Sequence, residues 1–228
     1  MKMKGNRPTL LVEGIHDHRV IKRLLTLHGF NTEHPKFPEI VHDGDVEDRG
    51  GGVSKVLSRI AVSARNESTL GIVIDADATP VARWTEVWGA VAQAIRTSDV
   101  PLAPSDGGFI MSRPNLPGHK LGVWLMPDNA SPGMLENFIA SLIPASDRCW
   151  PHARESTRRA RVDHGAGLRE IHESKGAINA WLAWQDPSGK PITTVLGKQA
   201  LDHDAPPALA FVTWFQRLFD LSPVQRGT

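Results

Sequence analysis

The chain has 228 residues, of which 40% are hydrophobic and 22% charged, and its formal net charge at pH 7 is +1. This composition is that of a globular protein, and the near-neutral charge excludes a strongly basic overall field as the means of attracting nucleic acid. The single cysteine, Cys149, excludes an internal disulfide and a multi-cysteine zinc ribbon.

The first part of the chain predicts two strand–helix units. Residues 9–12 form a short apolar run that predicts a strand, and the apolar residues after it recur at helical intervals until Gly29 ends the helix. Residues 39–42 predict a weaker second strand. Residues 53–64 then carry apolar side chains at helical spacing, which predicts a second helix.

A third unit follows directly. Residues 70–74 are continuously apolar, as expected of a strand that is covered on both faces, and Pro80 opens a helix with apolar positions at helical spacing. Three successive strand–helix units predict the α/β class, with a mostly parallel sheet flanked by helices.

The rest of the chain is predicted to be mainly helical. A short strand is expected at 109–112, and Leu121, Val123 and Leu125 alternate with other residues as in a half-buried strand. A helix is expected at 133–143, and helices with loops between them follow. We therefore predict a domain over residues 1–143 and a mainly helical C-terminal extension over 144–228 that packs on it.

Acidic residues follow two of the predicted strands. Glu13 comes directly after the first strand, and Asp75 and Asp77 end the third. Ligand crevices form at this edge of open parallel sheets, and the i, i+2 spacing of an extended chain should point both aspartates the same way. Three carboxylates held together raise one another's pKa unless a cation binds, and oxygen ligands without a thiol favour Mg²⁺ or Mn²⁺.

Two neighbours of Glu13 extend this hypothesis. Gly14 has no β-carbon, so a phosphate could approach closely, and Asp17 lies one helical turn further on, where it could hold a second metal ion. Each acid also has a simpler interpretation. Asp75 and Asp77 could merely end a strand, and Asp17 could stabilise a helix N-terminus through the helix dipole.

The sequence LLVEG, followed by a helix and about sixty residues later by GIVIDAD, resembles the TOPRIM domain shared by topoisomerases, primases, maturases and the OLD (overcoming lysogenisation defect) nucleases. The form VEGxxD, residues 12–17, is most similar to the OLD nucleases, in which the second acid helps to bind a second metal. The stretch GVWLMPDNASPGMLENFI resembles an uncharacterised bacterial family of stand-alone TOPRIM-like proteins. These resemblances imply a TOPRIM-like, metal-binding domain over residues 1–143.

The resemblance also implies further site residues. Glu136 would be an additional carboxylate on the metal side, with Ser131 close by, although a glutamate in a first helical turn is also simply favourable. OLD nucleases use a downstream lysine to neutralise the scissile phosphate. Lys175 is the best positional candidate and Lys198 is the alternative, while an exposed, solvated lysine is the simpler interpretation of either.

A cluster of arginines is the main candidate for nucleic-acid binding, because arginine contacts with phosphates give affinity that does not depend on sequence. The alternative is a solvated helix face. The cluster consists of Arg148, Arg154, Arg158, Arg159 and Arg161.

Composition narrows the function within the superfamily. The chain has no tyrosine for a covalent DNA link, which excludes a topoisomerase acting alone, and one cysteine in 228 residues argues against a primase with a zinc ribbon. We therefore predict metal-dependent phosphodiester hydrolysis of nucleic acid, with DNA favoured over RNA, and with Glu13, Asp75, Asp77 and Lys175 as catalytic residues.

Two other functions stay open: a non-catalytic module that binds a cation or nucleotide, and a small-molecule nucleotide phosphohydrolase. OLD nucleases carry an ATPase domain that this chain lacks, so a separately encoded ATPase partner is compatible with the sequence, as is a homodimer. A membrane span needs about 20 consecutive apolar residues, and no stretch of the sequence comes near this length. No export signal is evident either. We therefore expect a cytoplasmic protein without a membrane partner.

Overall fold

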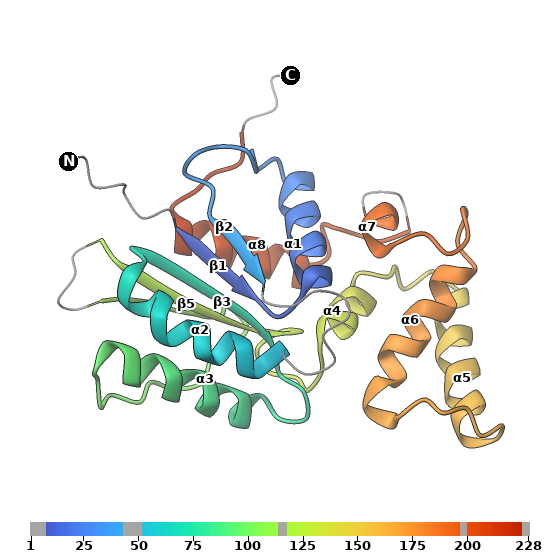
Figure 1. Cartoon of the computed structure of the whole chain (residues 1–228). Coiled ribbons are helices and arrows are strands. Elements are labelled where there is room, and N and C mark those ends of the chain that lie inside the picture. Colours follow the sequence, from blue (N-terminus) through green and yellow to red (C-terminus); the bar gives the residue numbers. More distant parts are fainter. Residues whose placement is uncertain (1–7, 43–51, 114–117, 197–199, 225–228) are drawn as a thin grey trace.

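A computed structural model of the chain describes residues 8–42, 52–113, 118–196 and 200–224, and in these ranges a five-stranded sheet carries helices on both faces (Figure 1). The strand order is β2-β1-β3-β5-β4. All neighbours are parallel except β4 and β5. This confirms the predicted α/β class and the mostly parallel sheet. The strands are β1 (Thr9–Val12), β2 (Glu39–His42), β3 (Thr69–Asp75), β4 (Phe109–Ser112) and β5 (Lys120–Met126).

The helices confirm the predicted strand–helix order of the first half and the mainly helical second half. Gly29 ends the first helix with a positive φ of 82°, and Pro80 begins the third. The helices are α1 (Ile15–Leu27), α2 (Gly52–Asn66), α3 (Pro80–Ile95), α4 (Leu135–Ser141), α5 (Cys149–Val162), α6 (Glu173–Ala183), α7 (Ile192–Val195) and α8 (Pro206–Phe219), and Glu170–His172 forms a short 3₁₀ helix.

The sheet separates two hydrophobic cores, because successive side chains of a strand point to opposite faces. On one face, Ile72 of β3 and Val123 of β5 pack with the apolar sides of α2 and α3. On the other face, Val73 and Trp124 pack with α1, α4 and α8. Figure 1 shows α2 and α3 together on one side of the sheet, with α5 and α6 beyond the carboxyl ends of the strands.

The prediction that β5 is half-buried is wrong. Residues 121–126 are all buried, including Trp124 and Met126, which face away from α2 and α3. The reason is that α8 covers the second face of the sheet with apolar side chains such as Trp214 and Leu218. The C-terminal segment therefore completes the hydrophobic core around the central strands.

Helix α4 is shorter than the predicted 133–143. Gly133 has a φ of 139° and pairs with Asp77 across a two-residue bridge, in which the Gly133 amide donates to the Asp77 carbonyl oxygen at 2.8 Å. This bridge holds the chain extended just before α4, so the helix begins only at Leu135. Among the helices in the described ranges, none has the length and apolar character needed to cross a membrane.

A substitution at Gly108 can test how closely α8 packs against the sheet. Its φ is +69°, and a Cβ atom there would lie 2.5 Å from Cδ1 of the buried Trp214. Gly165 has nearly the same φ, +67°, but nothing lies within 4 Å of an added Cβ. In urea unfolding, we expect Gly165→Ala to cost about 1–2 kcal/mol from the backbone alone. Gly108→Ala should cost about 1–3 kcal/mol more through overpacking, and equal losses would contradict this packing.

Candidate active site

The carboxyl ends of β1 and β3 bring acidic side chains from four elements together. Glu13 follows β1, Asp75 ends β3, Asp17 lies in the first turn of α1 and Glu136 in the first turn of α4. Glu13 and Asp75 are neighbours because β1 and β3 are adjacent parallel strands. The structure thus brings together four of the five acidic residues predicted as metal ligands.

Hydrogen bonds fix the positions of three of these carboxylates. The Asp75 amide donates to Oε2 of Glu13 at 2.9 Å, and the Leu135 amide at the start of α4 donates to Oδ1 of Asp75, also at 2.9 Å. The Gly14 amide donates to Oδ2 of Asp17 at 3.2 Å. Asp75 therefore links β1, β3 and α4 at one point, and it holds the turn after β1 against the start of α4.

Burial and mutual repulsion disfavour negative charge at this site. Burial raises the pKa of Asp75 well above its usual range, and the charges of Glu13, Asp17 and Glu136 raise it further. Burial and then the Glu13 carboxylate raise the pKa of Asp17 to about 7. The pKa of Glu13 is also raised by burial, although the amide of Asp75 and the charge of Arg83 act against this rise. The four carboxylates therefore lie within electrostatic reach of one another.

The four carboxylates supply the kind of oxygen donors that a divalent cation binds. Among the described residues, no three acidic, histidine or cysteine side chains are arranged around one point as ligands of a single ion. The chemistry of the group nevertheless fits a hard cation, because its donors are carboxylate oxygens whose buried charges repel one another. Glu13, Asp17, Asp75 and Glu136 are the residues that would hold such an ion after side-chain rotation.

The alternation of an extended strand predicts that Asp75 and Asp77 point the same way, but the chain is not extended at Asp77. The strand ends at Asp75, and Asp77 adopts a left-handed backbone conformation with a φ of 52°. Its carboxylate forms an ion pair with the guanidinium of Arg83. Its charge still raises the pKa of Glu13, so Asp77 lies beside the acidic group with its carboxylate already partnered.

Arg83 is a site residue that the sequence analysis missed. Its side chain is buried, and besides Asp77 it contacts the Asp75 carbonyl oxygen at 2.8 Å and Oε2 of Glu86 at 2.6 Å. The signal in the sequence is its place in α3, since it shares a helix face with the buried Val87 and Val91 at intervals of four. A buried charged residue on an apolar helix face needs polar partners, and two of the partners of Arg83, Asp77 and the carbonyl oxygen of Asp75, lie beside the acidic site.

The variant Arg83→Lys should distinguish the contribution of the positive charge of Arg83 from that of its several simultaneous contacts. Lysine keeps the positive charge beside Glu13 but cannot contact Asp75, Asp77 and Glu86 at once. Because Asp77 and Glu86 are partly exposed, we expect a loss of about 1–3 kcal/mol in the free energy of unfolding, measured with urea. Arg83→Met should cost more, since it also leaves both acids without a cation. Equal stability of wild type and Arg83→Lys would contradict the idea that Arg83 stabilises the fold by contacting Asp75, Asp77 and Glu86 at once.

The predicted lysine lies close to the carboxylates. Nζ of Lys175, in the first turns of α6, is 3.8 Å from Oε1 of Glu136. The side-chain Nδ2 of Asn137 donates to Oγ of Ser174 at 3.0 Å, which further ties α6 to α4. Ser131 donates its hydroxyl to Asp128 within the turn before α4. The alternative lysine, Lys198, lies outside the described residues.

The predicted arginine cluster lies on and beside α5, away from the sheet, and three of its members are paired with acids. These pairs join Arg158 to Glu155 at 2.8 Å, Arg159 to Asp163 at 3.5 Å and Arg161 to Glu173 at 2.9 Å. Arg154 lines a cavity of about 280 Å³ between α5, α6 and α4, and Arg148 precedes α5. Nucleic-acid binding by this cluster stays a prediction, and any phosphate would compete with these carboxylates.

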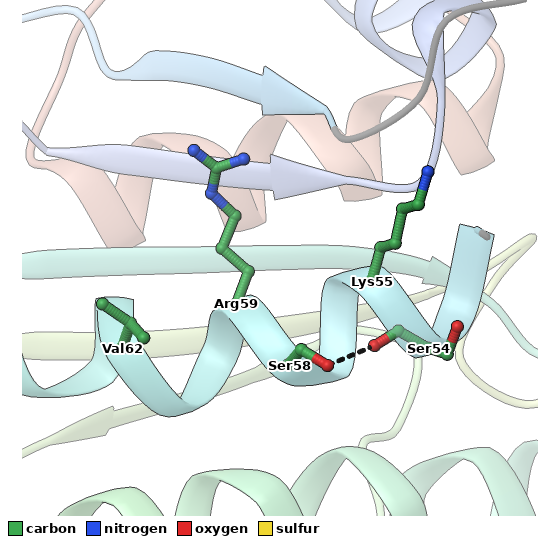
Figure 2. A pocket seen from close by; sticks show the side chains of 5 residues that line it. All are labelled: Ser54, Lys55, Ser58, Arg59 and Val62. Atoms are coloured by element: carbon green, nitrogen blue, oxygen red, sulfur yellow. Dashed lines mark hydrogen bonds between the residues drawn. The ribbon is translucent and has the colours of Figure 1, made fainter. Parts of the chain in front are cut away.

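A second basic surface lies on α2, whose first residue, Gly52, is close to Glu13. A shallow hollow of about 470 Å³ is lined by Ser54, Lys55, Ser58, Arg59 and Val62. Figure 2 shows Lys55 and Arg59 extending from the same side of α2, one turn apart. Both side chains already interact with other parts of the chain, and no acidic residue lines this hollow in the described part of the structure.

A family model described as "Protein of unknown function (DUF3226)" matches residues 7–220. The chain belongs to the DUF3226 family. No curated protein and no solved structure matches the chain significantly. The DUF3226 match runs from just before β1 to just after α8. It therefore includes the four carboxylates, Lys175 on α6 and the helix that closes the second face of the sheet.

Proposed function

We propose that this DUF3226 protein is a metal-dependent nuclease with a TOPRIM-like active site, which hydrolyses phosphodiester bonds with Mg²⁺ or Mn²⁺. One observation carries the proposal: Glu13, Asp17, Asp75 and Glu136 gather from four elements at the carboxyl edge of a parallel sheet. Burying four acids together costs free energy, and a bound divalent cation would turn this cost into affinity. The resemblance of LLVEG and GIVIDAD to TOPRIM sequences supports the same assignment.

Each residue then has a distinct role. Glu13 and Asp75 would hold the principal cation, and Asp17 and Glu136 would complete its site or hold a second ion. Such ions, when bound, activate water and stabilise the leaving oxygen of an in-line displacement. Lys175, which sits 3.8 Å from Glu136, would neutralise charge on the scissile phosphate. Arg83 would position Asp77 and the end of β3 through its contacts with both.

The proposal is tested with purified protein and end-labelled single-stranded and duplex DNA and RNA, in Mg²⁺, Mn²⁺ or EDTA. We expect cleavage that requires a metal ion. Metal binding without cleavage of any polymer would instead support the non-catalytic binding module. Hydrolysis of free nucleotides but not of polymers would support the small-molecule phosphohydrolase.

A further inference from the structure

A groove between α1 and α6 opens beside the acidic site. It has a volume of about 340 Å³, and its walls come from α1, α6 and the segment that leads into α7. Its lining includes the apolar side chains of Val20, Leu182 and Ile192 and the polar side chains of Arg19, Asn179 and Lys190. A hollow of this size accommodates a single nucleotide and is far too small for a duplex.

The charged side chains that line this groove are positive, and they are unpaired among the residues that the structure describes. Arg19 and Lys190 are exposed, and neither forms an ion pair or hydrogen bond with a residue that the structure describes. None of the described residues that line the groove is acidic. This distinguishes the groove from α5, where Arg158, Arg159 and Arg161 are paired with carboxylates.

On both of its helices, residues that line the groove lie close in the sequence to residues of the acidic site. On α1, His16 lines the groove and its chain neighbour Asp17 belongs to the carboxylate group. On α6, Asn179 lines the groove one turn after Lys175, which contacts Glu136. A strand lying in the groove would therefore reach the carboxylates at Lys175, with further phosphates at Arg19 and Lys190.

We infer that the α1–α6 groove is the path by which one single strand of nucleic acid enters the acidic site, with Arg19 and Lys190 contacting its phosphates. This rests on the proposed function for the identity of the substrate. A groove lined by cationic side chains is a usual means of holding the backbone of a single strand without sequence preference. The arginine cluster of α5 stays a separate prediction, and three of its members are paired with acids.

The test is fluorescence anisotropy of a fluorescein-labelled oligothymidylate at a series of salt concentrations. Ca²⁺ replaces Mg²⁺ in the buffer, because Ca²⁺ also takes oxygen ligands, and a gel run after each titration checks that the strand is intact. The groove variant is Arg19→Gln with Lys190→Gln. The matched control is Lys36→Gln with Arg96→Gln, which removes the same charge from exposed positions outside both the groove and the α5 cluster.

Two lost phosphate contacts should lower the slope of log K against log salt by about 1.4, at about 0.7 per contact. At 0.1 M salt this corresponds to about 25-fold weaker binding. The control variant should keep the slope and affinity of the wild type, and an unlabelled duplex should compete less well than a single strand. An unchanged slope in the groove variant, a loss of the same size in the control, or no binding by the wild type would each overturn the inference.

Cleavage assays in Mg²⁺ or Mn²⁺ separate this inference from the proposed function. If the wild type cuts and the groove variant binds and cuts as well as it does, the groove assignment is wrong and the nuclease stands. If the strand binds through Arg19 and Lys190 but is never cut, the groove stands and the nuclease assignment is wrong.

Discussion

Asp75→Asn is expected to remove metal-dependent cleavage while leaving the fold intact. The amide keeps an oxygen that can accept the hydrogen bond from the Leu135 amide, and the backbone amide of residue 75 still reaches Glu13. What is lost is the negative charge that a cation needs. Loss of outer-shell partners of a metal site costs about 10–100-fold, so loss of a ligand should lower the cleavage rate by more than about a hundredfold.

The measurement is the initial rate of cleavage at saturating Mn²⁺, beside circular dichroism to check the fold. Asp163→Asn is the matched control, because Asp163 is a partly exposed aspartate at the end of α5. It should cut at the wild-type rate. Asp77→Asn should fall between the two, because Arg83 already partners the Asp77 carboxylate. Wild-type activity in Asp75→Asn would remove Asp75 from the active site.

The features that could be predicted from the sequence are those that depend on local patterns. The apolar runs of residues 9–12 and 70–74, and the helical spacing after each, are sufficient to predict the central strands and their order as strand–helix units. The positions of Glu13 and Asp75 at one edge then follow, since parallel strands end at the same edge.

The features that could not be predicted depend on distant contacts or on single backbone angles. The burial of Trp124 needs α8, which lies about ninety residues further along the chain, and short-range periodicity carries no information about such a partner. The direction of the Asp77 side chain depends on one positive φ angle, which reverses the expected alternation. The pairing of the α5 arginines depends partly on Glu173 of α6, outside the cluster itself.

The pH dependence of stability should report on Asp17 in the metal-free protein. Burial and the Glu13 carboxylate raise the pKa of Asp17 from its usual 3.8 to about 7 in the folded state. Below the usual pKa the carboxyl group is protonated in both the folded and the unfolded state, so it does not lower the free energy of unfolding. As pH rises between the two values, only the unfolded state releases the proton freely, so the free energy of unfolding falls by about 1.4 kcal/mol per pH unit. The loss is complete above the folded pKa, where it amounts to about 4 kcal/mol.

Asp17→Asn isolates this effect, because the amide oxygen can still accept from Gly14 and the side chain no longer ionises. In urea unfolding with EDTA, the variant should gain stability over the wild type as pH rises from 4 to 8. Mg²⁺ should stabilise the wild type more at pH 8 than at pH 5, because protons compete with the ion for the same oxygens, and it should stabilise the variant less at either pH. If the two proteins differed in free energy of unfolding by the same amount across this pH range, the pKa of Asp17 would not be raised in the folded state. An equal Mg²⁺ response in both would remove Asp17 from the metal site.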